Sequence, residues 1–124
     1  MYLLDTNTII DFLNAKLPLN ANQLLFSIEP KVSVITRIEL FSSSKISEKE
    51  LVALNDFIEI VTVYENINTE IIAICIDLRK KYKIKLPDAL IAATAINNKL
   101  ILITRNTKDF ENVSELKCIN PYEL

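Results

Sequence analysis

Short apolar runs bounded by polar residues recur along the chain and predict the strands of a buried parallel sheet. The first run, Tyr2-Leu3-Leu4, leads directly into Asp5, and a similar run over residues 100–103 leads into Thr104. β-branched residues indicate further strands at 32–35 and 58–63, and a final short run covers 116–119. The chain is therefore expected to contain four or five strands.

Helical patterns separate these strands. The segments expected to be helical are 8–14, 22–28, 37–41, 48–57, 69–82 and 88–97. Thr36 is expected to cap the third of them, and Ser47 with Glu50 matches a capping box before the fourth. Because strands that alternate with helices pair in parallel, we predict one α/β domain over residues 1–124. It is expected to be a three-layer α/β/α sandwich with a central parallel sheet of four to five strands.

Two missing residue types restrict the chemistry. The chain has no histidine, which excludes Ser-His-Asp catalysis, Cys-His catalysis and metal sites with histidine ligands. It also has no glycine, which excludes the Walker loop and the GxGxxG dinucleotide motif. Without glycine, Asn97-Asn98 is expected to provide the left-handed backbone where a helix ends. A catalytic site must therefore use carboxylates, hydroxyls, amides, lysine or arginine.

Cysteine spacing, the length of the apolar runs and the N-terminal residues indicate the cellular compartment. Cys75 and Cys118 are far apart and lack the spacing of metal ligands, so we expect free thiols. No apolar run approaches the roughly 20 residues that span a bilayer, and no signal-peptide pattern precedes the first strand. We expect a cytoplasmic protein with no membrane segment.

Basic residues are concentrated in one part of a chain whose formal charge is −2. They surround Tyr82 and comprise Arg79, Lys80, Lys81, Lys83 and Lys85. They could contact the phosphates of RNA, or they could form a solvated helix end, where the helix dipole favours cations. The sequence leaves both interpretations open.

Four acids stand out because they lie at the ends of elements or among apolar neighbours: Asp5, Glu39, Asp88 and Asp109. Each alone has an ordinary explanation as a helix cap, a helix N-terminal anion, an exposed residue or a turn cap. Three of them, however, follow separate strands within a few residues. A parallel sheet places the ends of those strands at one edge, where ligands bind in open α/β folds.

Such a cluster requires a counter-charge. Two carboxylates about 5 Å apart repel by roughly 3 kcal/mol at an effective dielectric near 20. Protons or a cation would relieve this repulsion, and an all-oxygen set of ligands suits Mg²⁺ or Mn²⁺. We therefore expect metal-assisted hydrolysis of a phosphoester.

The same residues carry a resemblance to a known family. The motifs are Leu4-Asp5-Thr6-Asn7, Thr36-Arg37-Ile38-Glu39-Leu40, the run from Pro87-Asp88 to Ala95, and Thr104-Arg105-Asn106 continuing to Asp109-Phe110. In this order and over almost the whole chain, they resemble PIN-domain ribonucleases, more narrowly the VapC-type toxins of toxin–antitoxin pairs. Where many members have glycine after the glutamate helix, this chain has Ser42-Ser43-Ser44.

The resemblance implies an Mg²⁺-dependent endoribonuclease, with Mn²⁺ as a substitute, that is inhibited by a cognate antitoxin and forms a homodimer. It implies that Asp5 and Asp88 bind the metal, that Glu39 helps to position the metal or its water, and that Asp109 completes the site through water. Supporting roles fall to Thr6 and Thr104, which would orient the acids, and to Asn7 and Arg105, which would hold the local turns. Asn106 remains an alternative to Asp109 as the fourth site residue.

Other interpretations remain open. One is a non-catalytic acidic-pocket binding module, such as a phosphoacceptor domain, which needs an aspartate after a middle strand. The middle strand here ends in Val63-Tyr64, which counts against that module. Another is a degenerate nuclease fold kept for protein binding, which the presence of all four acids disfavours. The apolar residues within 14–31 could contact an antitoxin or belong to the core.

Overall fold

Five short parallel strands form the central sheet of the protein, whose structure is a computed structural model that describes residues 1–124. The strands are β1 (Tyr2–Leu4), β2 (Lys31–Ser33), β3 (Thr62–Tyr64), β4 (Ile101–Ile103) and β5 (Cys118–Ile119). Their order in the sheet is β3-β2-β1-β4-β5, and every neighbouring pair is parallel. The predicted parallel sheet is confirmed, with five strands.

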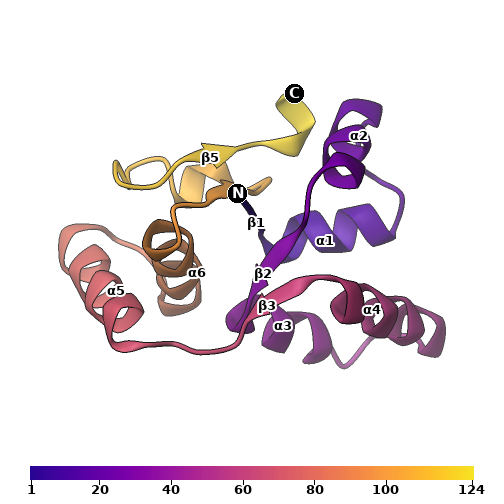
Figure 1. Cartoon of the computed structure of the whole chain (residues 1–124), viewed down its shortest axis with the longest axis horizontal. Coiled ribbons are helices and arrows are strands. Elements are labelled where there is room, and N and C mark those ends of the chain that lie inside the picture. The colour runs from indigo at the N-terminus through magenta and orange to yellow at the C-terminus, as the bar shows by residue number, and fades with distance from the viewer.

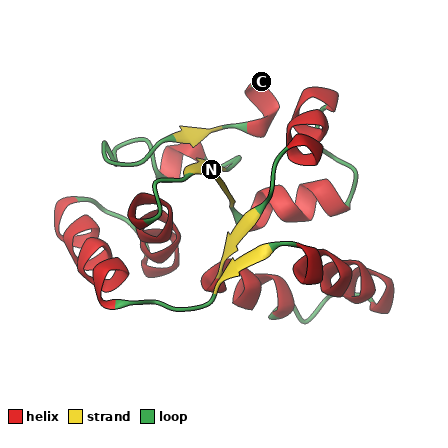
Figure 2. Cartoon of the chain, in the orientation of Figure 1, coloured by secondary structure: helices red, strands yellow, loops and turns green.

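Six α-helices cover the sheet. They are α1 (Thr6–Leu13), α2 (Leu19–Ser27), α3 (Val34–Phe41), α4 (Glu48–Ile60), α5 (Thr69–Lys81) and α6 (Leu86–Asn97). Two 3₁₀ turns, η1 (Thr107–Asp109) and η2 (Pro121–Glu123), flank β5. Figure 1 shows α5 and α6 on one side of the strands and α1 to α4 on the other. The same division is visible in Figure 2, where the loops joining the layers are green.

The alternation of side chains along each strand explains this layered arrangement. Leu3 and Leu102 belong to the apolar cluster under α5 and α6, which also contains Leu78 and Ile91. Their sequence neighbours Leu4 and Ile103 face the opposite way, into the cluster that includes Phe57 of α4. Both sheet faces are therefore buried, and the predicted α/β/α sandwich is confirmed.

Two predicted strands lie partly where the structure has a helix. The strand expected over 32–35 ends at Ser33, whose hydroxyl accepts the N–H of Thr36 at 3.1 Å and caps α3. Thr36 is therefore inside the helix, not its cap. The strand expected over 58–63 begins only at Thr62, because α4 continues to Ile60. Burial at a helical spacing outweighs the β-branched composition there, since Leu54 and Phe57 both face the core.

The left-handed backbone positions also differ from the prediction. They lie at Ala15 (φ 55°) and Lys99 (φ 56°), not at Asn97-Asn98. The amide Nδ2 of Asn98 donates to the Thr94 carbonyl at 2.8 Å, which keeps Asn98 at the helix end. The chain then reverses one residue later than expected.

The remaining expectations concern cysteines and apolar segments. Cys75 and Cys118 are free thiols, as predicted. No helix has the length and apolar content needed to span a bilayer. The apolar segment 14–31 is divided: Leu17 and Leu25 are buried in the core, whereas Leu19 and Phe26 are 71% and 79% exposed.

The order of the strands determines where a site can form. From β1 the chain proceeds outward to β2 and β3 and then returns to place β4 on the other side of β1. The ends of β1 and β4 thus form the topological switch point, where open α/β sheets bind ligands. The middle strand is β1, and Asp5 follows it directly. Contrary to the expectation from the sequence, Val63-Tyr64 therefore does not count against a phosphoacceptor module, because β3 is an edge strand and not the middle one.

Candidate active site

Asp5 lies at the switch point and is only 5% exposed. Its backbone N–H donates to the carbonyl of Ile103 at 3.0 Å, which fixes it beside the end of β4. Its Oδ1 accepts the N–H of Thr6 at 2.8 Å and thereby caps α1. The capping role considered from the sequence is present, and it coexists with a position at the end of the central strand.

Neutral donors hold the other oxygen of this carboxylate. Asp5 Oδ2 accepts the hydroxyl of Thr104 at 2.7 Å and the amide Nδ2 of Asn7 at 3.2 Å. A carboxylate has about four acceptor positions, so one position on Oδ1 remains open. A ligand would therefore reach Asp5 through the oxygen that also caps the helix.

Asn7 and Thr104 also shape the turn after β4. Asn7 Oδ1 accepts the backbone N–H of Arg105 at 3.1 Å, and Thr104 Oγ1 accepts that of Asn106 at 3.1 Å. The same two side chains thus fix Asp5 and the loop that leads to Asp109.

Glu39 reaches the cluster from α3. The hydroxyl of Thr6 donates to Glu39 Oε1 at 2.7 Å and lies 3.2 Å from the hydroxyl of the buried Thr36. Glu39 itself is exposed. One hydrogen bond therefore ties this acid to the residue that follows Asp5.

Electrostatics connects the other acids to Asp5. Burial, followed by the charges of Asp5, Asp109 and Glu39, raises the pKa of Asp88 from 3.8 to about 6, while Lys85 opposes this shift. Burial also raises the pKa of Asp5, against its hydrogen bonds from Thr104, Thr6 and Asn7. The charge of Glu39 adds to that rise. Asp88 is thus close enough to feel the charges of the other three acids.

The fourth position has two candidates. Asp109 ends η1, is exposed, and lines the same pocket as Asp88. Asn106 is also exposed but is not among the residues that line this pocket. Asp109 is therefore the one of the two that shares a pocket with Asp88.

The acids suit a hydrated metal better than a dehydrated one. No three of them are close enough together to hold an ion directly. Mg²⁺ usually binds through one or two carboxylates and keeps several waters, so a complete set of protein ligands is not required. None of the four acids has a salt bridge to lysine or arginine. An oxygen-only set of acids, none of them in a salt bridge, fits a divalent cation.

Comparison with known proteins agrees with this geometry. A family model of the PIN domain matches residues 2–116. The chain belongs to the PIN domain family. It is similar to a toxin–antitoxin complex from Klebsiella pneumoniae, with 35% identity, a TM-score of 0.80 and 100% of each chain covered. It is also similar to VapBC-1 from nontypeable Haemophilus influenzae, with 27% identity, a TM-score of 0.78 and 97% of each chain covered.

A DNA-bound VapBC from Salmonella typhimurium shares the fold, with 24% identity, a TM-score of 0.81 and 97% of each chain covered. A search of curated proteins found no match. The resemblance to PIN-domain, VapC-type proteins expected from the sequence is confirmed.

This PIN domain contains a second buried acid that the sequence analysis missed. Asp11 of α1 is 3% exposed, and its Oδ2 accepts Arg105 Nη1 at 2.9 Å and the Tyr122 hydroxyl at 2.8 Å. A charged residue within Ile9-Ile10-Asp11-Phe12-Leu13 is the signal that could have revealed it. The side chain of Arg105 thus pairs with Asp11, whereas its backbone N–H donates to Asn7, which in turn donates to Asp5.

A pocket of about 440 Å³ adjoins the acids. It is lined by Lys81, Tyr82, Lys83, Ile84, Lys85, Asp88, Lys108, Asp109, Asn112 and Val113. Of the five basic residues singled out from the sequence, three line this pocket, whereas Arg79 and Lys80 do not. Lys108 and Asn112 were not predicted, because they come from the distant loop after β4.

Proposed function

We propose that this PIN domain is an Mg²⁺-dependent endoribonuclease and the toxin of a toxin–antitoxin pair. It hydrolyses RNA phosphodiester bonds at the cluster of Asp5, Glu39, Asp88 and Asp109. The observation that carries the proposal is the state of Asp5, a buried carboxylate at the switch point that is held only by neutral donors. Three further acids surround it without a paired cation, which is a cost to the fold that a bound metal would offset.

The four acids and their hydrogen-bond donors would have different roles. Asp5 and Asp88 would hold the metal, with Glu39 and Asp109 acting through water. When bound, Mg²⁺ or Mn²⁺ supplies neutralising charge, orients the phosphate and lowers the pKa of a water. Thr104 and Asn7 keep Asp5 in one orientation, and Thr6 restrains Glu39, so little reorganisation is needed when RNA arrives.

The partners follow from the family and the surface. Similarity to chains of toxin–antitoxin complexes supports a cognate antitoxin as the protein partner. A homodimer and a cytoplasmic location are part of the same proposal. The lysines beside Asp88 support RNA as the substrate, since phosphates bind lysine clusters. A short upstream gene that encodes a basic DNA-binding protein would support the toxin role.

The decisive experiment is cleavage of RNA by the purified protein. Cleavage is expected with Mg²⁺ or Mn²⁺ and should stop when EDTA is added. Asp5→Asn and Asp88→Asn should each remove cleavage while the circular dichroism spectrum and the free energy of unfolding show a folded protein. Lys49→Ala, an exposed residue of α4 that forms no salt bridge and does not line the pocket beside Asp88, is the control and should cleave normally. Undiminished cleavage by the double variant of Asp5 and Asp88 would contradict the site.

A further inference from the structure

The pocket beside the acid cluster is built from three separate parts of the chain. Lys81 to Lys85 come from the end of α5 and the loop that follows it, and Asp88 comes from the first turn of α6. The third wall, Lys108 to Val113, includes part of η1 and the loop beyond it. Its volume of about 440 Å³ is within the range of small-ligand pockets.

Of the four lysines that line this pocket, only one forms salt bridges. Lys81 is already paired, with Asp77 at 3.0 Å and with Glu115 at 3.6 Å. Lys83, Lys85 and Lys108 form no salt bridge, although the chain as a whole has a formal charge of −2. Asp88 and Asp109 lie in the same lining. The pocket thus offers three free cations to an anion immediately beside the acid cluster.

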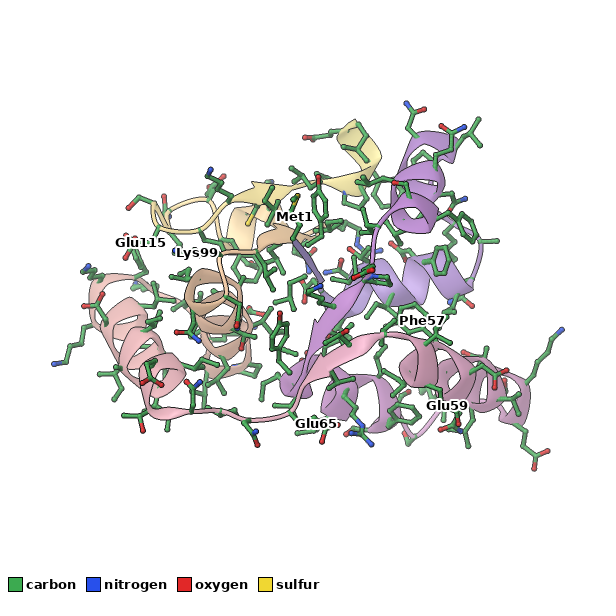
Figure 3. The ribbon with its side chains drawn as sticks, viewed as in Figure 1. Met1, Phe57, Glu59, Glu65, Lys99 and Glu115 are labelled. Carbon is green, nitrogen blue, oxygen red and sulfur yellow. The ribbon has the colours of Figure 1, made fainter.

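An aromatic ring in the same lining is held in place. Tyr82 is half-buried and packs against the core under α5 and α6. Its hydroxyl donates to Glu115 Oε1 at 2.8 Å. Glu115 belongs to the loop beside the end of α5, as its label in Figure 3 shows. Aromatic rings among lysines are the usual means of binding unpaired bases, because every base can stack.

We infer that this pocket binds one unpaired nucleotide of the RNA, next to the phosphodiester bond that is cut. The phosphate of this nucleotide contacts Lys83, Lys85 and Lys108, and its base stacks on Tyr82 with the amide of Asn112 within the same pocket. A base held in this way is unavailable for pairing, so the cut segment is single-stranded. The inference rests on the proposed function for the identity of the substrate as RNA.

Binding without cleavage tests the pocket independently of catalysis. The probe is a fluorescein-labelled single-stranded RNA of about ten nucleotides, a length within the usual site size for single strands. It is titrated in EDTA with the Asp5→Asn variant as the background, and fluorescence anisotropy is recorded at several salt concentrations. Each phosphate of a single strand that the protein neutralises contributes about 0.7 to the slope of log K against log salt.

The decisive variant replaces Lys83, Lys85 and Lys108 with alanine. Relative to the background it is expected to lose about 0.7 from the salt slope, the share of one phosphate, and to bind at least about tenfold more weakly. The matched control replaces Lys16, Lys49 and Lys117, which removes the same charge from exposed positions outside the pocket. The control should change affinity by less than about twofold, because exposed charges beyond a Debye length are screened.

The aromatic contribution is tested with a matched pair at Tyr82. Tyr82→Phe keeps the ring and removes the hydroxyl, whereas Tyr82→Leu removes the ring. The leucine variant should bind the single strand at least about fivefold more weakly than the phenylalanine variant, as expected for a lost stacking contact. Competition with a duplex RNA of the same sequence should be weak.

Two results would overturn the inference: equal salt slopes for the pocket and control triple variants, or displacement of the probe by duplex as readily as by single strand. If the wild-type protein cleaves RNA and the slopes are equal, the proposed function stands and the pocket assignment fails. If the wild-type protein cleaves nothing and the slopes differ as expected, the pocket binds RNA and the proposed catalysis fails.

Discussion

Two aspartates near the start of the chain are buried to a similar degree but have different hydrogen-bond partners. Asp5 is 5% exposed and Asp11 is 3% exposed. Asp11 has a cation and a phenol as partners, through Arg105 and Tyr122. Asp5 has only neutral donors and faces other acids.

The difference separates a buried charge that the fold compensates from one that it leaves uncompensated. A buried carboxylate is costly unless it is paired, and the chain provides a full partner only for Asp11. At Asp5 the hydrogen bonds fix the orientation of the carboxylate but leave its charge uncompensated. A site that binds a cation requires this combination of fixed geometry and free charge.

The two aspartates are also physically linked. Arg105 contacts Asp11 with its guanidinium and Asn7 with its backbone N–H, and Asn7 contacts Asp5. Tyr122 brings the C-terminal turn η2 into the same network. The structural pair therefore supports the loop that borders the acid cluster.

The largest expected effect is on catalysis at Asp5. Asp5→Asn keeps the shape, and its amide oxygen can still cap α1, but the charge is lost and the amide nitrogen cannot accept from Asn7. RNA cleavage should fall by about 10³-fold or more, as expected when several kcal/mol of metal-assisted stabilisation are lost. The free energy of unfolding, measured with urea, should change by less than about 1 kcal/mol. An active Asp5→Asn protein would remove the distinction between the two aspartates.

The reverse effect is expected at Asp11. Asp11→Ala leaves Arg105 and Tyr122 without their shared acceptor and should lower the free energy of unfolding by about 2–4 kcal/mol. This is less than for a fully orphaned ion, because the Arg105 side chain is half-exposed and can turn to water. Cleavage by the folded fraction should decrease only about tenfold, through the loosened loop. Urea denaturation of Asp11→Ala, Arg105→Ala and the double variant checks that the two residues act together. The double variant should lose less stability than the sum of the two single variants.

The sequence predicted Asp5 better than Asp11 for a physical reason. An apolar run that ends in a carboxylate is a local signal, so the strand and its acid could both be inferred. The partners of Asp11 lie 94 and 111 positions away, and only the folded chain brings them together. The central position of β1 is likewise a property of strand order, which the apolar pattern does not encode. α4 was predicted too short because local β-branching competes there with burial at helical spacing.

A smaller effect is expected from pH at Asp88. Its pKa rises from 3.8 to about 6 in the folded protein, so the folded state binds more protons than the unfolded state between these values. Stability without metal should therefore increase as the pH falls from 7 to 5, by no more than about 1 kcal/mol once solvent screening is considered. Asp88→Asn should weaken this dependence, as checked by urea denaturation in EDTA. An unchanged pH dependence in that variant would contradict the raised pKa of Asp88, which comes first from burial and then from the neighbouring acids.

The smallest effect is expected at Tyr122, and it tests how much of the network depends on the C-terminal turn. Tyr122→Phe removes one hydrogen bond to Asp11 but leaves Arg105 in place, so the loss of stability should be about 0.5–1.5 kcal/mol. The remaining ion pair still holds the Arg105 loop. Cleavage should therefore decrease by less than about threefold, which corresponds to the low end of this energy range. A loss as large as that of Asp11→Ala would mean that the phenol, not the guanidinium, keeps Asp11 buried. Urea denaturation of the two variants side by side distinguishes these possibilities.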